Sequence, residues 1–169
     1  MTGQITPVVR LSEQALERSE RGTLFGSADA HRLGTAAGLR SIGFTYTVVE
    51  AGRSGAPFHN HHVEDEMFVV MEGEGTYRFG KERYPFRAGD VLIAPAGGQE
   101  TAHQIINTGT VPLKMVAISN QSPIEVCEYP DSGKFLVSSK PPGEAAKLRH
   151  ISRHPDRHIE DYWDGEPGA

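Results

Sequence analysis

Residues 52–73 read GRSGAPFHNHHVEDEMFVVMEG, with two histidines two positions apart, a carboxylate, and an apolar run that ends at glycine. Alternate residues of a β-strand point to the same side of the strand. His59 and His61 on one strand would therefore present two imidazoles to a single atom. The polar residues 62–65 predict a turn, and the run MFVVM after Glu66 predicts a second strand.

The open question in this stretch is which acidic residue faces the same side as the two histidines. Glu66 lies five positions after His61, so on an unbroken strand it would face away, and Asp65 would be better placed. A turn over residues 62–65 resets the phase and favours Glu66. A third imidazole comes from a separate strand-like run further along the chain. We therefore predict a mononuclear metal site formed by His59, His61, Glu66 and His103.

Imidazole nitrogens and a carboxylate oxygen make a mixed donor set, which suits Mn, Fe, Ni, Cu or Zn better than Mg or Ca. Four such ligands can close a tetrahedral structural site on zinc. On an octahedral metal they leave two positions for water or a bidentate substrate. Phe68 and Val70 share the parity of Glu66, and Ile105 that of His103, so we expect a partly dry pocket. There a metal can act as a Lewis acid or lower the pKa of bound water.

Composition limits the class of protein. The chain has 169 residues, 19 glycines, 11 prolines and a net charge of −5, which favours one domain of short strands and disfavours nucleic-acid binding. A single cysteine, Cys127, excludes an internal disulfide and fits a reducing compartment. No signal-peptide pattern is visible and the apolar runs are too short to cross a bilayer. We expect a soluble, cytoplasmic protein that binds neither nucleic acid nor membrane.

Strand-like segments recur every eight to twelve residues, which is typical of a sandwich or barrel. Residues 39–50 alternate and predict a strand with Ile42, Phe44, Tyr46 and Val48 toward the core. Residues 76–86 predict a hairpin that turns at Gly80 and Lys81, and His103 and Ile105 are expected to face inward together. Further strands are expected at residues 91–95, 111–119 and 122–130.

Two segments resemble the paired motifs of the cupin superfamily. Residues 57–73 contain HxH, four residues, glutamate, six residues and glycine, and residues 89–107 contain glycine, five residues, Pro-x-Gly, and a histidine with asparagine four positions later. Two spacings depart from the pattern: six residues separate Gly52 from His59, and the gap from Gly97 to His103 is three residues longer than usual. The resemblance implies a small barrel with metal ligands at its open mouth, which favours the open octahedral site.

The fold we expect is all-β: a single antiparallel double-stranded β-helix (jelly-roll, or cupin) barrel with a short N-terminal helix and a C-terminal arm. Residues 1–38 are an extension, with an amphipathic helix that begins near Ser12 and stops at Gly22. Residues 39–128 form the barrel, and residues 129–169 an arm packed on the barrel or on a partner subunit. Exposed sheet edges need covering and single-barrel relatives commonly pair, so we expect a homodimer.

A metal held this way suits a small-molecule substrate with two neighbouring oxygens: a hydroxy or keto acid, a sugar derivative or a diol. We expect one divalent Mn, Fe, Ni or Zn ion and an enzyme that works by isomerisation, dioxygenation or decarboxylation. Tyr46, Glu50 and Tyr77 are the candidate general bases. The segments YPDSGK and DYWDGE resemble stand-alone bacterial cupins loosely labelled sugar-phosphate-isomerase-like, a label that says little about substrate.

Two other functions stay open at this point. The barrel could be a non-catalytic module that binds or senses a carbohydrate-like molecule, or a metal-free structural barrel. A second histidine series, His150, His154 and His158, recurs every four residues and would line one face of a helix. Pro155 would break a helix that runs through from residue 150, so we expect solvated histidines there and no second metal site.

Overall fold

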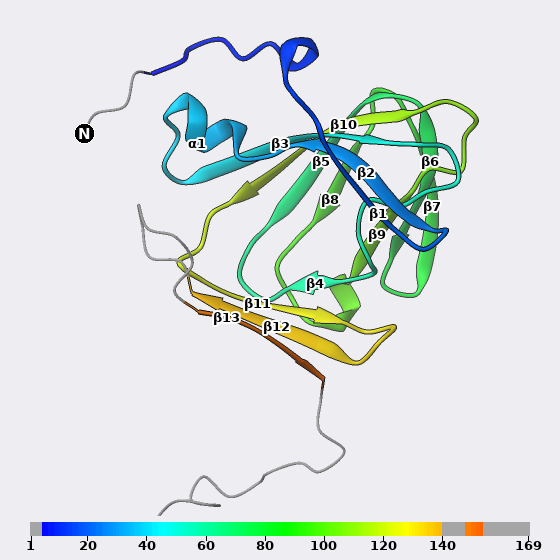
Figure 1. Ribbon diagram of the computed structural model, residues 1–169. Coiled ribbons are helices and arrows are strands. Elements are labelled where there is room, and N and C mark those ends of the chain that lie inside the picture. Colours follow the sequence, from blue (N-terminus) through cyan, green and yellow to red (C-terminus); the bar gives the residue numbers. More distant parts are fainter. Residues whose placement is uncertain (1–4, 140–147, 154–169) are drawn as a thin grey trace, which may run out of the picture.

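The computed structural model describes residues 5–139 and 148–153, and these consist almost entirely of antiparallel β-strands (Figure 1). Within these ranges the α-helix is α1 (Leu33–Ala37), and single 3-10 turns lie at Leu11–Glu13 and Gln99–Thr101. The strands are β1 (Glu17–Arg21), β2 (Phe25–Ala30), β3 (Ile42–Val49), β4 (Asn60–His61), β5 (Glu66–Glu72), β6 (Glu74–Phe79), β7 (Glu82–Arg87), β8 (Val91–Ala94), β9 (His103–Ile106), β10 (Leu113–Asn120), β11 (Ile124–Tyr129), β12 (Lys134–Ser139) and β13 (Leu148–Arg153).

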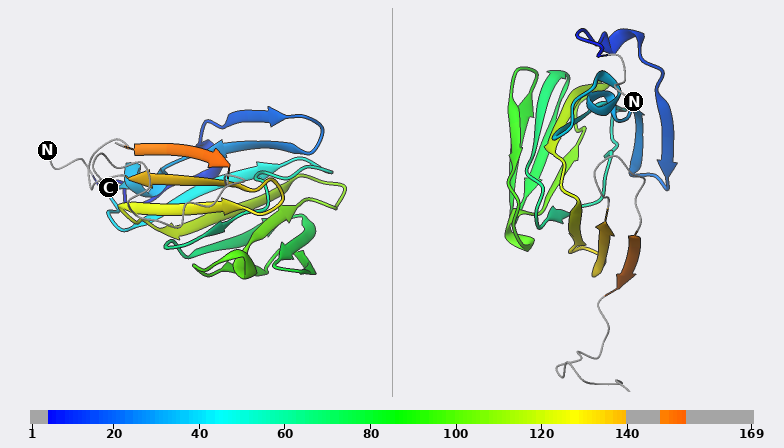
Figure 2. Two further views of the ribbon diagram at one scale, coloured as in Figure 1. Left: turned by 90° about the horizontal axis from the view of Figure 1, so that it is seen from below. Right: turned by 90° about the vertical axis from the view of Figure 1, so that its left-hand side faces the viewer.

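The strands form three sheets. A six-stranded sheet has the order β1-β2-β3-β10-β5-β8, a four-stranded sheet the order β13-β12-β11-β4, and a three-stranded sheet the order β7-β6-β9. The four-stranded sheet lies below the large sheet in Figure 1 and the three-stranded sheet lies to its right, and Figure 2 shows the same layers from two other sides. Adjacent strands in each sheet are antiparallel. The all-β antiparallel architecture expected from the sequence is confirmed.

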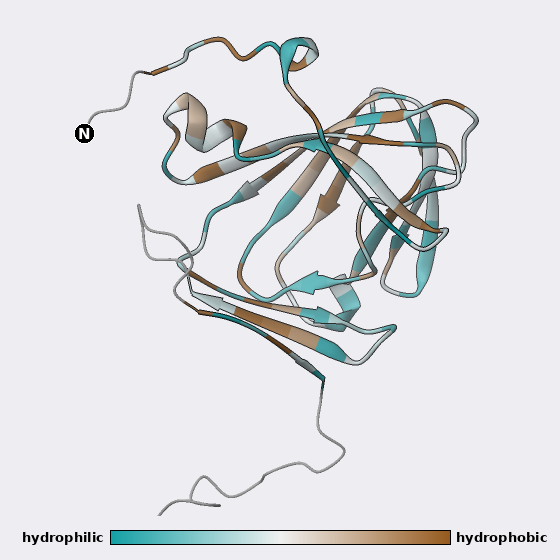
Figure 3. Ribbon diagram, viewed as in Figure 1, coloured by the Kyte–Doolittle hydropathy of each residue, from teal (hydrophilic) through white to brown (hydrophobic). Residues whose placement is uncertain are grey.

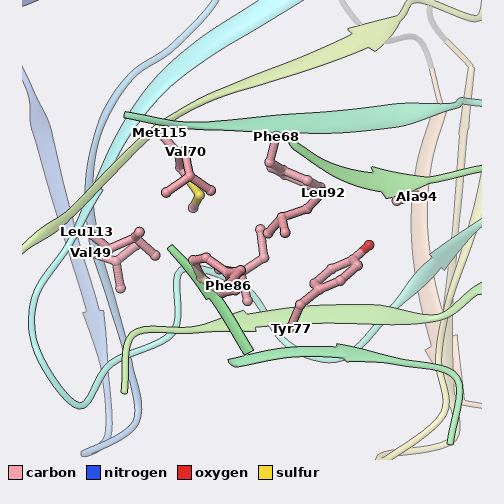
Figure 4. Packing of buried hydrophobic residues seen from close by; sticks show 10 residues of the cluster. Val49, Phe68, Val70, Tyr77, Phe86, Leu92, Ala94, Leu113 and Met115 are labelled. Carbon is pink, nitrogen blue, oxygen red and sulfur yellow. The ribbon is translucent and has the colours of Figure 1, made fainter. Parts of the chain in front are cut away.

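The hydrophobic core fills the space between the large sheet and the three-stranded sheet (Figure 4). Its side chains come from the inward-facing positions of both sheets, and Leu113, Val49 and Val70 are fully enclosed. The hairpin predicted at Gly80 and Lys81 is present, and it carries Tyr77 into this core. The cluster is Val49, Phe68, Val70, Tyr77, Phe86, Leu92, Ala94, Ile105, Leu113 and Met115.

The face of strand β3 that points to the interior is the opposite of the one predicted from its hydropathy. Thr47 and Val49 are buried, whereas Ile42 is 49% exposed, so the expectation that Ile42, Phe44, Tyr46 and Val48 face the core is wrong. Alternation identifies the two faces of a strand, but the more apolar face is the inner one only where the other face meets water. Here the inner face lines a partly polar cavity, whereas on the outer face Phe44 packs against Gly34 of α1 and Ile42 stays half exposed.

The outward side of the large sheet is apolar across four adjacent strands, and we call it the outer apolar face. The registers align two rows of side chains, and Met67, Val91 and Ile93 within them are 39%, 49% and 55% exposed. Monomeric proteins rarely expose large contiguous apolar patches, so a face of this kind points to an interaction surface. The rows are Ile93, Met67, Ile118 and Phe44, and Val91, Val69, Val116 and Tyr46.

The N-terminal segment extends the large sheet. The amphipathic helix expected from Ser12 to Gly22 is replaced by the 3-10 turn at Leu11–Glu13 and the edge strand β1. A helix of that length is marginal without a packed face, whereas β1 gains backbone hydrogen bonds along β2, which in turn pairs with β3. The short helix α1 lies later in the chain and ends at Gly38, whose φ of 101° is left-handed.

The C-terminal segment begins as two further strands. Strands β12 and β13 continue the four-stranded sheet outward from β11, where the sequence pattern predicted an arm without strands. The hydrophobic residues 135–137 form the brown run on β12 in Figure 3. His150 lies on strand β13, not on a helix; His154, His158, Tyr162 and Trp163 lie outside the described residues. No helix in residues 5–139 or 148–153 is long and apolar enough to cross a membrane.

Gly75 provides a test of the packing between β6, β7 and β9. A methyl group at this position would overlap the carbonyl oxygen of Ile106 and lie 2.6 Å from a ring carbon of Phe86. We expect Gly75→Ala to lower the free energy of unfolding by about 1–3 kcal/mol, measured by chemical denaturation. The matched control is Gly26→Ala in β2, where the nearest atoms lie at 3.6 Å. Equal stability of the two variants would contradict this packing.

Candidate metal centre

A backbone pair places two of the predicted ligands side by side. The His59 N–H donates to the carbonyl oxygen of His103 at 3.1 Å, and the His103 N–H donates to that of His59 at 2.7 Å. The two imidazole rings then lie 4.6 Å apart, centroid to centroid. Strand β4 holds the third ring, that of His61, 5.0 Å from His59. Segments more than forty residues apart therefore bring three imidazoles together at one end of the interior.

Glu66, the first residue of β5, supplies the carboxylate. Its Oε2 lies 3.3 Å from Nε2 of His61 and 3.3 Å from Nε2 of His103. Asp65 is exposed, and its Oδ1 accepts the backbone N–H of Ala96 at 2.8 Å. The turn over residues 62–65 therefore resets the strand phase, and Glu66, not Asp65, faces the histidines.

The four predicted ligands converge, though not all equally. Candidate ligand atoms of His59, Glu66 and His103 all lie within 4.8 Å of one another. His61 forms such a group with His59 and Cys127, and it joins the first group through its 3.3 Å contact with Glu66. Burial raises the pKa of Cys127 to about 12, so this residue stays a thiol and is a weaker donor than the imidazoles.

The imidazoles are oriented for metal ligation. Nδ1 of His59 lies 2.8 Å from the carbonyl oxygen of Pro57, and Nδ1 of His103 lies 3.3 Å from that of Thr101. A neutral imidazole that donates from Nδ1 leaves the Nε2 lone pair free for a cation. The buried Nδ1 of His61 makes no hydrogen bond, and Oε2 of Glu125 lies 3.7 Å from it. The donor set and its outer partners therefore fit a divalent transition metal.

The electrostatics of the cluster suit the same ligand. Burial, with the neighbouring imidazoles of His103 and His61, lowers the pKa of His59 to about 4, so this ring is neutral near pH 7, as a metal ligand must be. Burial alone would raise the pKa of Glu66, but the neighbouring imidazoles of His103 and His61 hold it well below its usual range. Burial opposes protonation of His61, but Glu66 outweighs it and raises the pKa of that ring.

Glu125 holds the turn that positions Glu66, and the sequence analysis missed it. Its carboxylate accepts the backbone N–H groups of His62 at 3.0 Å, Val63 at 3.2 Å and Glu64 at 2.7 Å. Only 6% of the residue is exposed. The available signal was its parity with the buried Cys127 on β11, which marks an inward-facing carboxylate. His62, by contrast, is exposed and its Nε2 lies 3.3 Å from Glu128.

A cavity of about 260 Å³ opens beside the cluster. None of the candidate bases Tyr46, Glu50 and Tyr77 lines it: Tyr46 belongs to the outer apolar face, Glu50 is exposed, and the hydroxyl of Tyr77 donates to the carbonyl oxygen of Ile93. Burial raises the pKa of Tyr77 further. The lining is Asp29, His31, Thr45, Thr47, Gly55, Ala56, His59, Glu66, Phe68, His103, Gln104, Ile105, Met115 and Ala117.

Antiparallel sheets around a histidine-lined interior define a jelly-roll protein with a candidate metal centre. A family model described as "Cupin domain" matches residues 45–119. A predicted oxalate decarboxylase from Thermotoga maritima is 30% identical in sequence, with a TM-score of 0.59, over 68% of this chain and 99% of that one. The chain belongs to the cupin superfamily, as its motifs predict.

Two further comparisons give the range of relatives. A crystal structure from Acidithiobacillus ferrooxidans, named provisionally as a sugar phosphate isomerase, is 26% identical with a TM-score of 0.72 over 88% of this chain and 91% of that one. The oxalate-binding protein of Thermotoga maritima is 32% identical over 65 residues, 38% of this chain and 51% of the relative. The chain spans about half the length of the curated relatives it matches.

The turn offers a direct test of how Glu66 is positioned. We expect Glu125→Gln to lower the free energy of unfolding by about 1–3 kcal/mol, because a buried charged acceptor of several N–H groups is lost. The matched control is Glu72→Gln, an exposed partner of Lys114 at 2.7 Å, which we expect to change stability by less than about 1 kcal/mol. Denaturant titrations measure both. A stable Glu125→Gln protein would show that the turn does not depend on this carboxylate.

Proposed function

We propose that the chain holds one divalent Mn, Fe, Ni or Zn ion through His59, His61, Glu66 and His103 and acts as an enzyme on a small, oxygen-rich metabolite. The observation that carries this proposal is the convergence of three imidazoles and one carboxylate beside a cavity of about 260 Å³, which His59, Glu66 and His103 help to line. A volume just under the ~300–1,000 Å³ of drug-sized sites suits a substrate of a few carbons.

The bound metal would supply a Lewis acid that two neighbouring substrate oxygens can chelate. The chain's own residues would then position and shield the substrate. Phe68 and Ile105, beside the ligands, make the wall apolar and limit water at the reacting end. Thr45 and Thr47 offer hydroxyls further along the cavity. The substrate classes we favour are hydroxy or keto acids, sugar derivatives and diols, and the reaction classes are isomerisation, dioxygenation and decarboxylation.

The comparisons agree with a chelating substrate without choosing a reaction. Both Thermotoga maritima matches are named for oxalate, which presents neighbouring oxygens, and the Acidithiobacillus ferrooxidans protein is named for an isomerisation. We further infer a cytoplasmic location from the free thiol of Cys127, since free cysteines are typical of reducing compartments.

A non-catalytic binding or sensing module is the alternative. It is favoured by one observation: no candidate base considered above lines the cavity, so proton transfer would need Glu66 or another wall residue. The two functions separate on incubation of the metal-loaded protein with hydroxy acids, keto acids and diols. Conversion of a compound supports the enzyme, and oxygen uptake identifies a dioxygenase. Tight retention of an unchanged compound would favour the binding module.

Metal content tests the proposed ligands. We expect about one metal ion per chain in the purified protein and a loss of at least about tenfold in metal affinity for His59→Ala, because the cluster loses one of its imidazoles. The matched control His62→Ala removes an exposed neighbour and should leave the content unchanged. Elemental analysis after dialysis measures both, and equal content in the parent and His59→Ala would contradict the site.

We also propose that the chain is a homodimer joined through the outer apolar face. Four strands about 4.8 Å apart, with two rows about 7 Å apart along them, make a flat apolar surface ~20 Å wide once side chains are included. Such a surface would form the apolar core of an interface, and polar neighbours such as the pair of Lys114 and Glu72 would form its rim. A two-fold axis brings the same face of a second copy against it.

We expect charged side chains introduced on the outer apolar face to separate the two subunits. The double variant Met67→Glu, Ile93→Glu places carboxylates on two exposed side chains of one row, and we expect it to sediment as a monomer because each interface would bury four charges. The control is Ile124→Glu, at a 58% exposed position on β11. Analytical ultracentrifugation measures the masses. A monomeric parent, or a dimeric double variant, would contradict the proposed interface.

A further inference from the structure

The N-terminal extension contributes a buried carboxylate to the cavity. Asp29, on β2, is 9% exposed and lines the cavity together with Thr47, its register partner on β3. Its Oδ2 accepts a hydrogen bond from the hydroxyl of Ser27. A carboxylate can accept about four hydrogen bonds, so this one partner leaves acceptor capacity toward the cavity. Strands β2 and β3 lie side by side in Figure 1.

Asp29 and Glu66 lie apart on the inner face of the large sheet. On the inner face, Glu66 pairs with Ser119, Phe68 with Ala117, and Val70 with Met115, which is opposite Thr47. The row of Asp29 is therefore two rows away from Glu66, with two intervening strands, β3 and β10. One cavity touches both carboxylates. A ligand chelated at one end would direct its other end toward Asp29.

The wall at this second end selects by charge. Of the fourteen described residues that line the cavity, none is lysine or arginine, and the polar ones beside Asp29 are Thr45, Thr47 and His31. A buried carboxylate repels a phosphate or a second carboxylate and accepts hydrogen bonds from hydroxyls. Threonine hydroxyls both donate and accept, so they complement further hydroxyls on the ligand.

We propose that Asp29, Thr45 and Thr47 form a distal subsite that binds the hydroxyl groups of a short, uncharged polyhydroxylated tail. This inference rests on the proposed function, because it assumes that the head of the ligand chelates the metal. It specifies the substrate as a polyhydroxy acid or related sugar derivative that carries no phosphate on its distal carbon. Ser27 acts as a positioning residue that holds the Asp29 carboxylate.

Three compounds that share one chelating head group and differ in their tails show how much the tail contributes to the affinity. α-Hydroxybutyrate has an apolar tail, threonate has the same carbon chain with two more hydroxyls, and the third is threonate phosphorylated on its terminal hydroxyl. Their dissociation constants are measured by calorimetry on the full chain loaded with Mn²⁺. The variants are Asp29→Asn and Thr45→Val. The control is Thr76→Val on β6, because the Thr76 hydroxyl shares a hydrogen bond with the Thr108 hydroxyl and does not line the cavity.

In the parent we expect threonate to bind at least about tenfold more tightly than α-hydroxybutyrate, the effect of a hydrogen bond to a charged acceptor. The phosphate ester should bind more weakly than threonate. In Asp29→Asn the preference for threonate should fall to about twofold and the penalty on the ester should shrink, with the affinity for α-hydroxybutyrate unchanged. Thr45→Val should reduce the preference without affecting that penalty, and Thr76→Val should match the parent.

Two results with the parent protein would overturn the subsite while the metal proposal stands: equal affinities for threonate and α-hydroxybutyrate, or tighter binding of the phosphate ester than of threonate. An equal loss of all three affinities in Asp29→Asn would show a merely structural role and also overturn it. If Asp29→Asn does not fold, the parental comparisons and Thr45→Val decide. Failure of the Mn²⁺-loaded parent to bind α-hydroxybutyrate would remove the chelation proposal and the subsite with it.

Discussion

The change of strand phase between His61 and Glu66 is the constraint on which the candidate site depends. A strand alternates sides with a period of two, so an uninterrupted strand would direct Glu66 away from the imidazoles. The turn that corrects the phase lies at the surface, where His62, Val63 and Asp65 are exposed, and its backbone N–H groups point toward a buried carboxylate. Glu125 provides the anchor by accepting three consecutive backbone N–H groups. The placement of Glu66 beside His61 therefore depends on β4, β5 and the Glu125 side chain of β11, and β9 adds His103.

The turn and the candidate ligands together bring several negative charges close to one another. Glu64, Glu66 and Glu125 gather around His61, and burial raises the pKa of Glu64. Three kinds of partner offset the repulsion: imidazoles at Glu66, turn amides at Glu125, and the backbone N–H of Ser122, which donates to Glu64 at 2.7 Å. Buried like charges are costly unless they are paired or neutralised. A divalent cation beside Glu66 would lower the remaining cost, which is a physical reason to expect the metal in addition to the choice of donor atoms.

The sequence predicts the site better than its surroundings. Histidine spacing and the polar turn were enough to place His59, His61 and Glu66 at one point, because these residues lie within eight positions and local geometry relates them. Glu125, Cys127 and Asp29 could not be placed, because each reaches the site through strand pairings that no local pattern specifies. The face of β3 was misassigned because the inner side of the large sheet lines a partly polar cavity while its outer side carries apolar residues, so hydropathy does not mark the inner face. Residues 12–22 were misassigned because edge pairing outweighed a weak helical pattern.

In the proposed distal subsite, one residue comes from a part of the chain that does not carry the candidate ligands: Thr45 and Thr47 lie within residues 45–119, whereas Asp29 does not. The candidate ligands lie within residues 45–119, the part that matches the family, whereas Asp29 and His31 come from the preceding segment and approach the same cavity from β2. Relatives that share the motif can therefore hold the same metal and differ in the wall that meets the far end of the substrate. A phosphate needs cationic or N–H-rich surroundings, and this wall offers a carboxylate and hydroxyls instead. We therefore expect an activity named for a relative in this chain only where the relative has a similar wall around the far end of the substrate.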